Sequence, residues 1–230
     1  MFTRKTFEYF ELAKKNKNNA RWFEKNKEFY QENVHQPLSE FVLAIHDELQ
    51  GDLPRIEISP RSITRPLRPK NKVADGAGLV KTTAHITISE KRTSLFEWNP
   101  GIYFQIGADR DDNFFGLGLY MVSSRQLSRL RDALFENFNE IDLILSDRRL
   151  KKVWGGILGE KYKRFPKGFD PNDPRSQYLW HKQFYLGLEL SKKDLTNKNF
   201  QKQAVTNLKV AVPFFKWVRH SVGTYKTKVL

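Results

Sequence analysis

Arginine and lysine side chains gather in residues 60–81, PRSITRPLRPKNKVADGAGLVK, where the only acidic residue is Asp75. An arginine guanidinium is planar and can make two parallel hydrogen bonds to one phosphate, which makes phosphate-bearing ligands its natural partners. We predict that Arg65, Arg68 and Lys81 make the main anion contacts. Three prolines and two glycines argue against a regular element here, so we predict a loop that is mobile without its partner.

A second basic region covers residues 148–167, and aromatic residues are interleaved with its lysines and arginines. Aromatic rings beside cations can stack nucleic acid bases while the cations hold phosphates. We therefore predict a second tier of anion contacts from Lys27, Arg131 and Lys167.

Signatures of catalysis are sparse. His85 is a candidate catalytic residue, but a lone histidine is more often a hydrogen-bonded structural residue. Asp109, Asp111 and Asp112 could hold a cation, although aspartates are also common at hairpin tips because they stabilise turns. Phosphate-binding loops, nucleophile elbows and paired histidines are absent from the sequence, so we predict no metal and no cofactor.

The composition excludes several classes of protein. The net charge is +14, which favours nucleic acid and phosphorylated ligands as partners, although a basic surface is often only a solvated one. The 18 Phe, 8 Tyr and 5 Trp indicate a packed globular chain, and the lack of cysteine excludes disulfides and thiolate chemistry. The N-terminus has no signal core and no run reaches membrane-spanning length, so we expect a cytoplasmic protein without a membrane partner.

Residues 82–122 predict consecutive antiparallel strands, because apolar and polar residues alternate through them. Residues 183–190 form a further strand, and helical periodicity covers residues 20–36, 123–146 and 192–218. Consecutive strands with separate helices are typical of an α+β fold. We predict a single α+β domain over residues 1–230, with a central antiparallel sheet packed by helices.

Two features of this fold have alternative interpretations. Trp22 shares an apolar helical stripe with Phe29 and Tyr30, which favours a buried position over an exposed stacking platform. Gly116 and Gly118 leave one face of their strand without side chains, and either a packed helix or a ligand could approach the backbone there.

Several short motifs, in order, resemble a bacterial family of unknown function known as domain of unknown function 2461. They begin with Asn18-Asn19-Ala20-Arg21-Trp22-Phe23, continue with Gly116-Leu117-Gly118-Leu119-Tyr120 and end with Arg164-Phe165-Pro166-Lys167-Gly168-Phe169-Asp170. In the family's Arg-x-x-Arg-Asp stretch, Arg65 and Arg68 are retained and Pro69 replaces the aspartate. The resemblance, which is that of a divergent member, implies a shared fold and no particular activity.

Three functions remain open from the sequence. The first is a module that binds an anionic partner, most favourably nucleic acid, through phosphate contacts. The second is an enzyme acting on a phosphorylated small molecule in a pocket near the glycine-bearing strand, rimmed by Arg65, Arg68, Lys81 and His85. The third is a structural or interaction protein without catalysis. The spatial distribution of charge discriminates between them.

Overall fold

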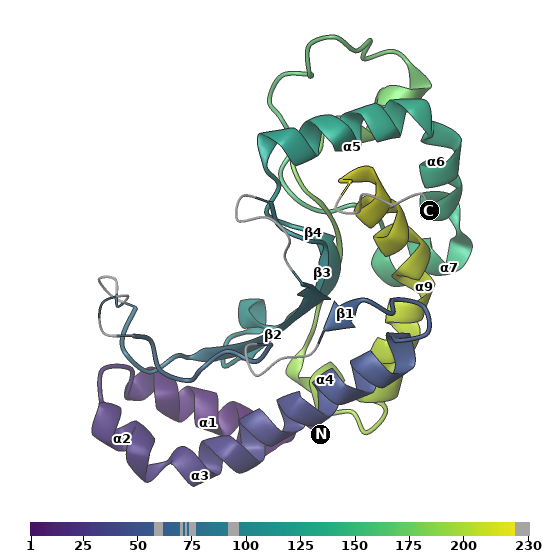
Figure 1. Ribbon diagram of the computed structural model, residues 1–230. Coiled ribbons are helices and arrows are strands. Elements are labelled where there is room, and N and C mark those ends of the chain that lie inside the picture. Colours follow the sequence, from purple (N-terminus) through teal and green to yellow (C-terminus); the bar gives the residue numbers. More distant parts are fainter. Residues whose placement is uncertain (58–61, 70, 72, 74–76, 92–96, 224–230) are drawn as a thin grey trace. The chain divides into compact units, whose positions relative to one another are not determined.

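The computed structural model of the chain describes residues 1–57, 62–69, 71, 73, 77–91 and 97–223 (Figure 1). Helical elements in chain order are α1 (Arg4–Lys15), α2 (Ala20–Lys25), α3 (Lys27–Tyr30), η1 (Gln31–His35), α4 (Gln36–Leu49), η3 (Arg110–Asp112), α5 (Ser124–Glu136), α6 (Phe138–Ser146), α7 (Arg148–Trp154), η4 (Pro174–Tyr178), α8 (Lys192–Leu195) and α9 (Phe200–Ser221). The strands are β1 (Ile56–Glu57), β2 (Thr83–Glu90), β3 (Gly101–Gly107), β4 (Phe114–Leu119) and β5 (Phe184–Glu189).

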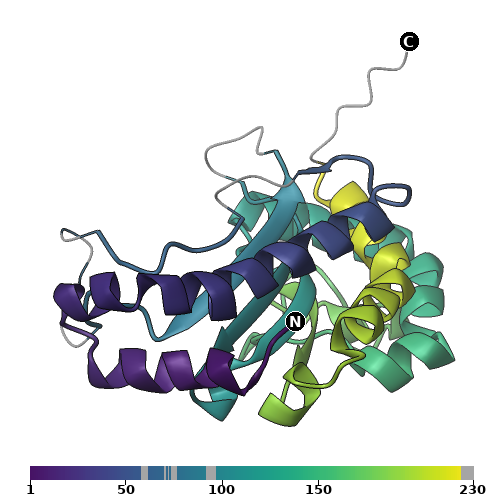
Figure 2. The same cartoon turned by 90° about the horizontal axis from the view of Figure 1, so that it is seen from below.

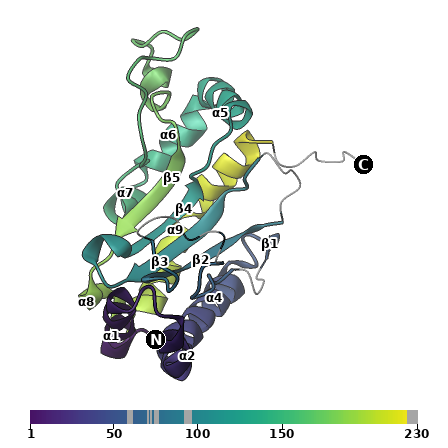
Figure 3. The same cartoon turned by 90° about the vertical axis from the view of Figure 1, so that its left-hand side faces the viewer.

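Within the described residues, the five strands form one antiparallel sheet in the order β1-β2-β3-β4-β5. Figure 3 shows β2, β3 and β4 side by side. Each strand pairs with the strand before it in the sequence, so the sheet contains no crossover. The prediction of an α+β fold with a central antiparallel sheet packed by helices is confirmed, including the late strand β5.

The chain packs as two compact units. Unit 1 contains Met1–Ile88, Ile102–Phe115 and Leu188–Thr206, and unit 2 contains Ser89–Gly101, Gly116–Gly187 and Asn207–Leu230. The chain passes several times from one unit to the other. These passages fall within strands of the sheet and within α9. A single domain over the whole chain stays a prediction.

The core of unit 1 is a cluster of phenylalanines on the face of β3 that packs against α4. The ring centroid of Phe104 lies 5.0 Å from that of Phe41 on α4 and 5.4 Å from that of Phe2. Phe115 and Phe200 complete the cluster, at 5.9 Å and 5.5 Å from Phe41. Rings at these separations gain from dispersion and from edge-to-face packing in addition to the burial of apolar area.

A nearly continuous helical run leads from α2 to α4, and α1 lies beside it (Figure 2). Asn19 caps the start of α2, since its side chain accepts a hydrogen bond from Trp22 N at 3.0 Å. Pro37 interrupts the regular α-helical pattern without ending the run, and a π-helical turn, η1, widens the helix just before it. Proline cannot donate to the carbonyl four residues earlier. That carbonyl, on Asn33, instead accepts a 2.7 Å hydrogen bond from the buried Thr6 hydroxyl.

Trp22 lies half-buried in this run, with its ring centroid 5.7 Å from that of Tyr9. The expectation that Trp22 is a core residue is wrong in degree, because Phe23, Tyr30 and Val34 take the buried positions. Phe23, Tyr30 and Val34 follow one another at steps of seven and four residues, so the buried stripe is centred on these side chains and Trp22 lies at its edge.

Unit 2 is built from α5, α6, α7 and the C-terminal part of α9. Ser123 and Gln126 form a capping box at the start of α5, with both reciprocal hydrogen bonds at 3.2 Å. Trp154 at the end of α7 is buried and donates from Nε1 to the carbonyl of Asn207 on α9 at 3.0 Å. Pro213 lies inside α9 without ending it.

The glycine at position 118 is explained by the neighbouring strand. A Cβ atom built on Gly118 would lie 2.4 Å from the carbonyl oxygen of Phe184 and 2.6 Å from Cα of Tyr185 on β5, and Gly118 has a φ of +130°. The space beside Gly118 is therefore filled by β5 rather than by a packed helix or a ligand. The predicted ligand pocket at the glycine-bearing strand loses its support at this position.

Candidate anion-binding face

The described part of the basic loop runs alongside β2 in unit 1. Isolated antiparallel bridges join Ile63 to Ile86 and Leu67 to Val80. Arg68 N donates to Leu79 O at 2.9 Å, and Lys81 N donates to Pro66 O at 2.8 Å. These bonds bring Arg68 next to the start of β2, although residues 62–69 belong to no named strand.

Three rings lie in a row across β2, β3 and β4, on the side opposite the phenylalanine core. His85 and Tyr103 have centroids 5.3 Å apart, and Tyr103 and Phe114 have centroids 6.3 Å apart. The Tyr103 hydroxyl donates to Gln105 Oε1 at 2.7 Å, which fixes the direction of the phenol. We call Arg68, Lys81, His85, Tyr103 and Phe114 together the cationic sheet face.

The charges of this face are set by burial. Burial, and then the nearby charge of Arg68, lower the pKa of Lys81 below its ordinary value. Burial, and then the charge of Lys81, lower the pKa of His85 to about 4, so its ring is neutral at neutral pH. Among the described residues, neither Arg68 nor Lys81 forms an ion pair with a carboxylate. A positive charge without an internal counter-ion is suited to an external anion.

A second cationic surface adjoins this face at the turn between α1 and α2. The turn forms a shallow depression of about 580 Å³. It is lined by Lys14, Lys15, Asn16, Lys17, Asn18, Asn19, Ala20 and Arg21. Val80 N donates to Lys17 O at 2.7 Å, which holds the turn against the segment that carries Lys81. Lys15, Lys17 and Arg21 are not among the anion contacts predicted from the sequence.

The structure separates the remaining predicted contacts. Arg65 and Lys27 are exposed in unit 1, whereas Arg131 and Lys167 belong to unit 2. Arg131 on α5 holds its guanidinium carbon 5.0 Å from the centre of the Tyr162 ring, so it is engaged in a cation–π contact. The other cations of the basic loop, Arg61, Lys70 and Lys72, lie outside the described residues together with Asp75.

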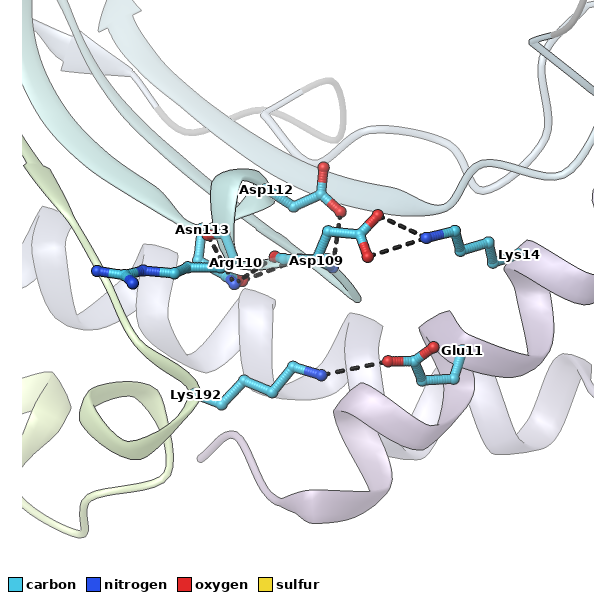
Figure 4. Close-up of polar contacts among 8 residues, drawn as sticks. Glu11, Lys14, Asp109, Arg110, Asp112, Asn113 and Lys192 are labelled. Carbon is cyan, nitrogen blue, oxygen red and sulfur yellow. Dashed lines mark hydrogen bonds and ion pairs between the residues drawn. The ribbon is translucent and has the colours of Figure 1, made fainter.

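The aspartates of the β3–β4 hairpin serve the fold of unit 1 (Figure 4). Asp109 pairs with Lys14, whose Nζ lies 2.7 Å and 2.9 Å from the two carboxylate oxygens. Asp112 accepts a hydrogen bond from Asp109 N at 3.0 Å and thereby caps the short helix η3. Elsewhere in unit 1, Lys192 reaches Glu11 at 3.2 Å. No group of three or more His, Cys, Asp and Glu side chains in the described residues could hold a metal ion.

The other histidine of interest, His181, is buried in unit 2 with 6% of its surface exposed. Its ring centroid lies 6.1 Å from that of Phe184, and its Nδ1 has no hydrogen-bond partner among the described residues. Burial, and then the charge of Lys161, lower the pKa of His181 to about 4.

We expect the free energy of unfolding to fall as the pH drops from about 6.5 to about 4, because the unfolded chain takes up a proton on His181 first. The contribution of neutral His181 to the free energy of unfolding is fully present above the unfolded-state pKa of about 6.5. It is lost as the pH falls through the folded-state pKa of about 4. Urea unfolding at a series of pH values measures this loss. The variant His181→Gln should show a shallower pH dependence, whereas replacing the exposed His220 should leave it unchanged. An equally steep dependence in His181→Gln would contradict the assignment.

Fold and surface together define an α+β protein with a cationic, ring-bearing sheet face. The chain belongs to the family described as conserved hypothetical protein (DUF2461), whose model matches residues 5–217. No curated protein and no solved structure matches the chain. Of the helices that the structure describes, none has the length and apolar character needed to cross a membrane.

Proposed function

We propose that this protein binds nucleic acid, preferentially single-stranded, at the cationic sheet face of unit 1. The observation that carries the proposal is the combination of two cations that lack carboxylate partners in the described part of the chain, Arg68 and Lys81, with a row of rings on the same sheet. Phosphates carry the negative charge that Arg68 and Lys81 do not meet on any carboxylate of the described residues, and bases have flat faces on which rings can stack.

The arrangement of the cations supports a backbone-directed contact. Arg68 uses Nη1 to donate to the carbonyls of Ala77 and Gly78, each at 3.0 Å, which fixes the guanidinium in place. The depression at the α1–α2 turn adds Lys15, Lys17 and Arg21 in unit 1. Several cations along one surface follow the repeating charge of a nucleic acid strand better than that of a single small anion.

The rings favour a single strand over a duplex. Bases within a duplex are stacked on one another, and their faces are not available to side chains. His85, Tyr103 and Phe114 project from adjacent strands at successive separations of 5.3 Å and 6.3 Å. Unstacked bases can lie against rings held in this way, and stacking of this kind tolerates any base. We therefore propose weak sequence preference.

Affinity should fall steeply with salt, with a log–log slope of about −0.7 for each phosphate contact on a single strand. The double variant Arg68→Gln with Lys81→Gln, both on the cationic sheet face, should make the slope shallower by about 1.4. Fluorescence anisotropy of a labelled single-stranded oligonucleotide over a range of salt concentrations measures both quantities. The variant Lys151→Gln with Lys152→Gln removes the same charge from exposed positions on α7 in unit 2 and is the matched control.

The same titration separates this proposal from its main alternative, an enzyme that acts on a phosphorylated small molecule. If no oligonucleotide binds at low salt, while isothermal titration calorimetry shows a sugar phosphate binding at micromolar concentration, the small molecule is favoured. Equal slopes in the two double variants would place the phosphate contacts away from the cationic sheet face.

A further inference from the structure

Lys81 differs from the lysines that form ion pairs in the structure. Lys14 and Lys182 hydrogen-bond to Asp109 and Glu160, and these hydrogen bonds raise the pKa of each ammonium group. Lys81 instead is half-buried beside Arg68 and forms no ion pair with a carboxylate in the described part of the chain. Its environment therefore disfavours the charged form of the amine.

The position of Lys81 is held by the backbone on both sides. Its own N–H donates to Pro66 O at 2.8 Å, and the preceding residue, Val80, is fully buried and donates to Lys17 O at 2.7 Å. Lys81 is also close enough to His85 for its charge to lower the pKa of that imidazole. An amine that is partly desolvated and adjacent to another cation is a known arrangement for a lysine nucleophile, because both effects increase the fraction without a proton.

Nucleophilic and phosphate-binding groups thus occupy one surface. Arg68 is fixed beside the amine, and the cationic α1–α2 turn lies against the same segment. A ligand that satisfies both kinds of group must carry a phosphate and, within a few atoms of it, an electrophilic carbon. Aldehydes are the electrophiles that react reversibly with lysine amines in water.

We propose that Lys81 forms an imine with the aldehyde of an open-chain sugar that bears a phosphate. This inference rests on the proposed function, because it assigns the phosphate to the cationic sheet face. The same chemistry occurs in two sources. One is a free aldose phosphate, and the other is the open-chain deoxyribose at an abasic position of a nucleic acid strand.

The step is balanced without any oxidant or reductant. The unprotonated Nζ of Lys81 attacks the aldehyde carbon and forms the C–N bond, while the electron pair of the C=O bond moves to oxygen. The resulting carbinolamine loses its oxygen as water, which carries away the two protons of the original amine. The C=N double bond of the imine remains, and water reverses the reaction.

Reductive trapping at neutral pH tests this inference. Cyanoborohydride delivers a hydride to the imine carbon, and a proton from water completes a stable secondary amine. The probes are ribose 5-phosphate and a single-stranded oligonucleotide with one abasic position, each followed by peptide mapping of the wild-type protein. We expect the adduct on Lys81, with trapping favoured over an exposed lysine by about tenfold for each pKa unit of difference.

Two conservative variants locate the reaction. Lys81→Arg keeps the positive charge but cannot form an imine, and it should lose the adduct. Lys5→Arg changes an exposed lysine on α1 of the same unit, outside the cationic turn, and should keep the adduct. Adducts spread over the exposed lysines and unaffected by Lys81→Arg would overturn the inference. Because the adduct is mapped on the wild-type protein, its position can be determined even if a variant fails to fold.

Separate measurements distinguish failure of this inference from failure of the proposed function. Anisotropy with an intact oligonucleotide, which has no aldehyde, reports binding alone. Binding of that oligonucleotide without trapping of the abasic one on Lys81, and without trapping of ribose 5-phosphate, would overturn the inference and leave nucleic acid binding in place. Trapping of ribose 5-phosphate on Lys81 without oligonucleotide binding would support the inference and assign the small molecule as the source.

Discussion

Replacing Gly118 with alanine is expected to destabilise unit 2 by about 2–5 kcal/mol. The added Cβ would lie 2.4 Å from the carbonyl oxygen of Phe184 and 2.6 Å from Cα of Tyr185. Both contacts are with the backbone of β5, so no side-chain rotation relieves them. The φ of +130° at Gly118 adds a second cost, since residues with a Cβ atom rarely adopt it.

Gly156→Ala is the matched control, because it adds the same methyl group in the same unit with no atom within 4 Å. We expect the free energy of unfolding of this variant to remain within about 0.5 kcal/mol of the wild-type value. Chemical denaturation followed by tryptophan fluorescence measures both variants. A Gly118→Ala protein with the wild-type denaturation midpoint would show that β4 and β5 can separate at this point without loss of stability.

The central sheet could be predicted from the sequence because its two faces have different chemistry. Ala84, Ile86 and Ile88 on β2 alternate with His85 and Thr87, and in the structure the first three are buried while the last two are not. A strand has a period of two residues, so alternation alone identifies which side chains share a face. Alternation likewise places His85 and Tyr103 on the face away from the core.

Two local features that the sequence did not reveal depend on contacts between distant segments. The run from α2 to α4 continues through Pro37 because Thr6, from α1, satisfies the carbonyl of Asn33. Glycine at position 118 reflects the approach of β5 and not an open face. In both cases the contacting residue lies in a different part of the chain. The local sequence of the segment therefore does not indicate the contact.

The candidate site was predicted only in part, because some of its residues are close together in the sequence and others are brought in from distant segments. Arg68, Lys81 and His85 lie within one stretch of chain, and antiparallel pairing brings them together. Lys17 joins them through a hydrogen bond to Val80, which is distant in the sequence. Lys167 was grouped with these residues by charge alone, and it belongs to unit 2. A count of charges favours an anionic partner, whereas backbone pairing determines which of the charged side chains lie together.

Two adjacent residues of β3 should differ in what they lose when each is replaced by alanine: Phe104 mainly stability, and Tyr103 mainly binding. Phe104 is fully buried and its ring contacts those of Phe2, Phe41, Phe115 and Phe200 in unit 1. Phe104→Ala should therefore cost about 3–5 kcal/mol of stability, because it removes apolar contacts and leaves a cavity. Tyr103 lies half-buried on the cationic sheet face, where its ring contacts those of His85 and Phe114.

Tyr103→Ala should cost roughly 1–2 kcal/mol of stability and weaken the binding of single-stranded oligonucleotides by about 1–3 kcal/mol. The second figure corresponds to roughly a 5- to 150-fold increase in Kd. Tyr103→Phe is the control, because it retains the ring and removes only the hydroxyl that donates to Gln105. Urea unfolding and anisotropy on the wild type and these three variants test the pair. Wild-type affinity in Tyr103→Ala, together with the expected loss of stability in Phe104→Ala, would contradict the prediction. The rings of the cationic sheet face would then have no part in binding.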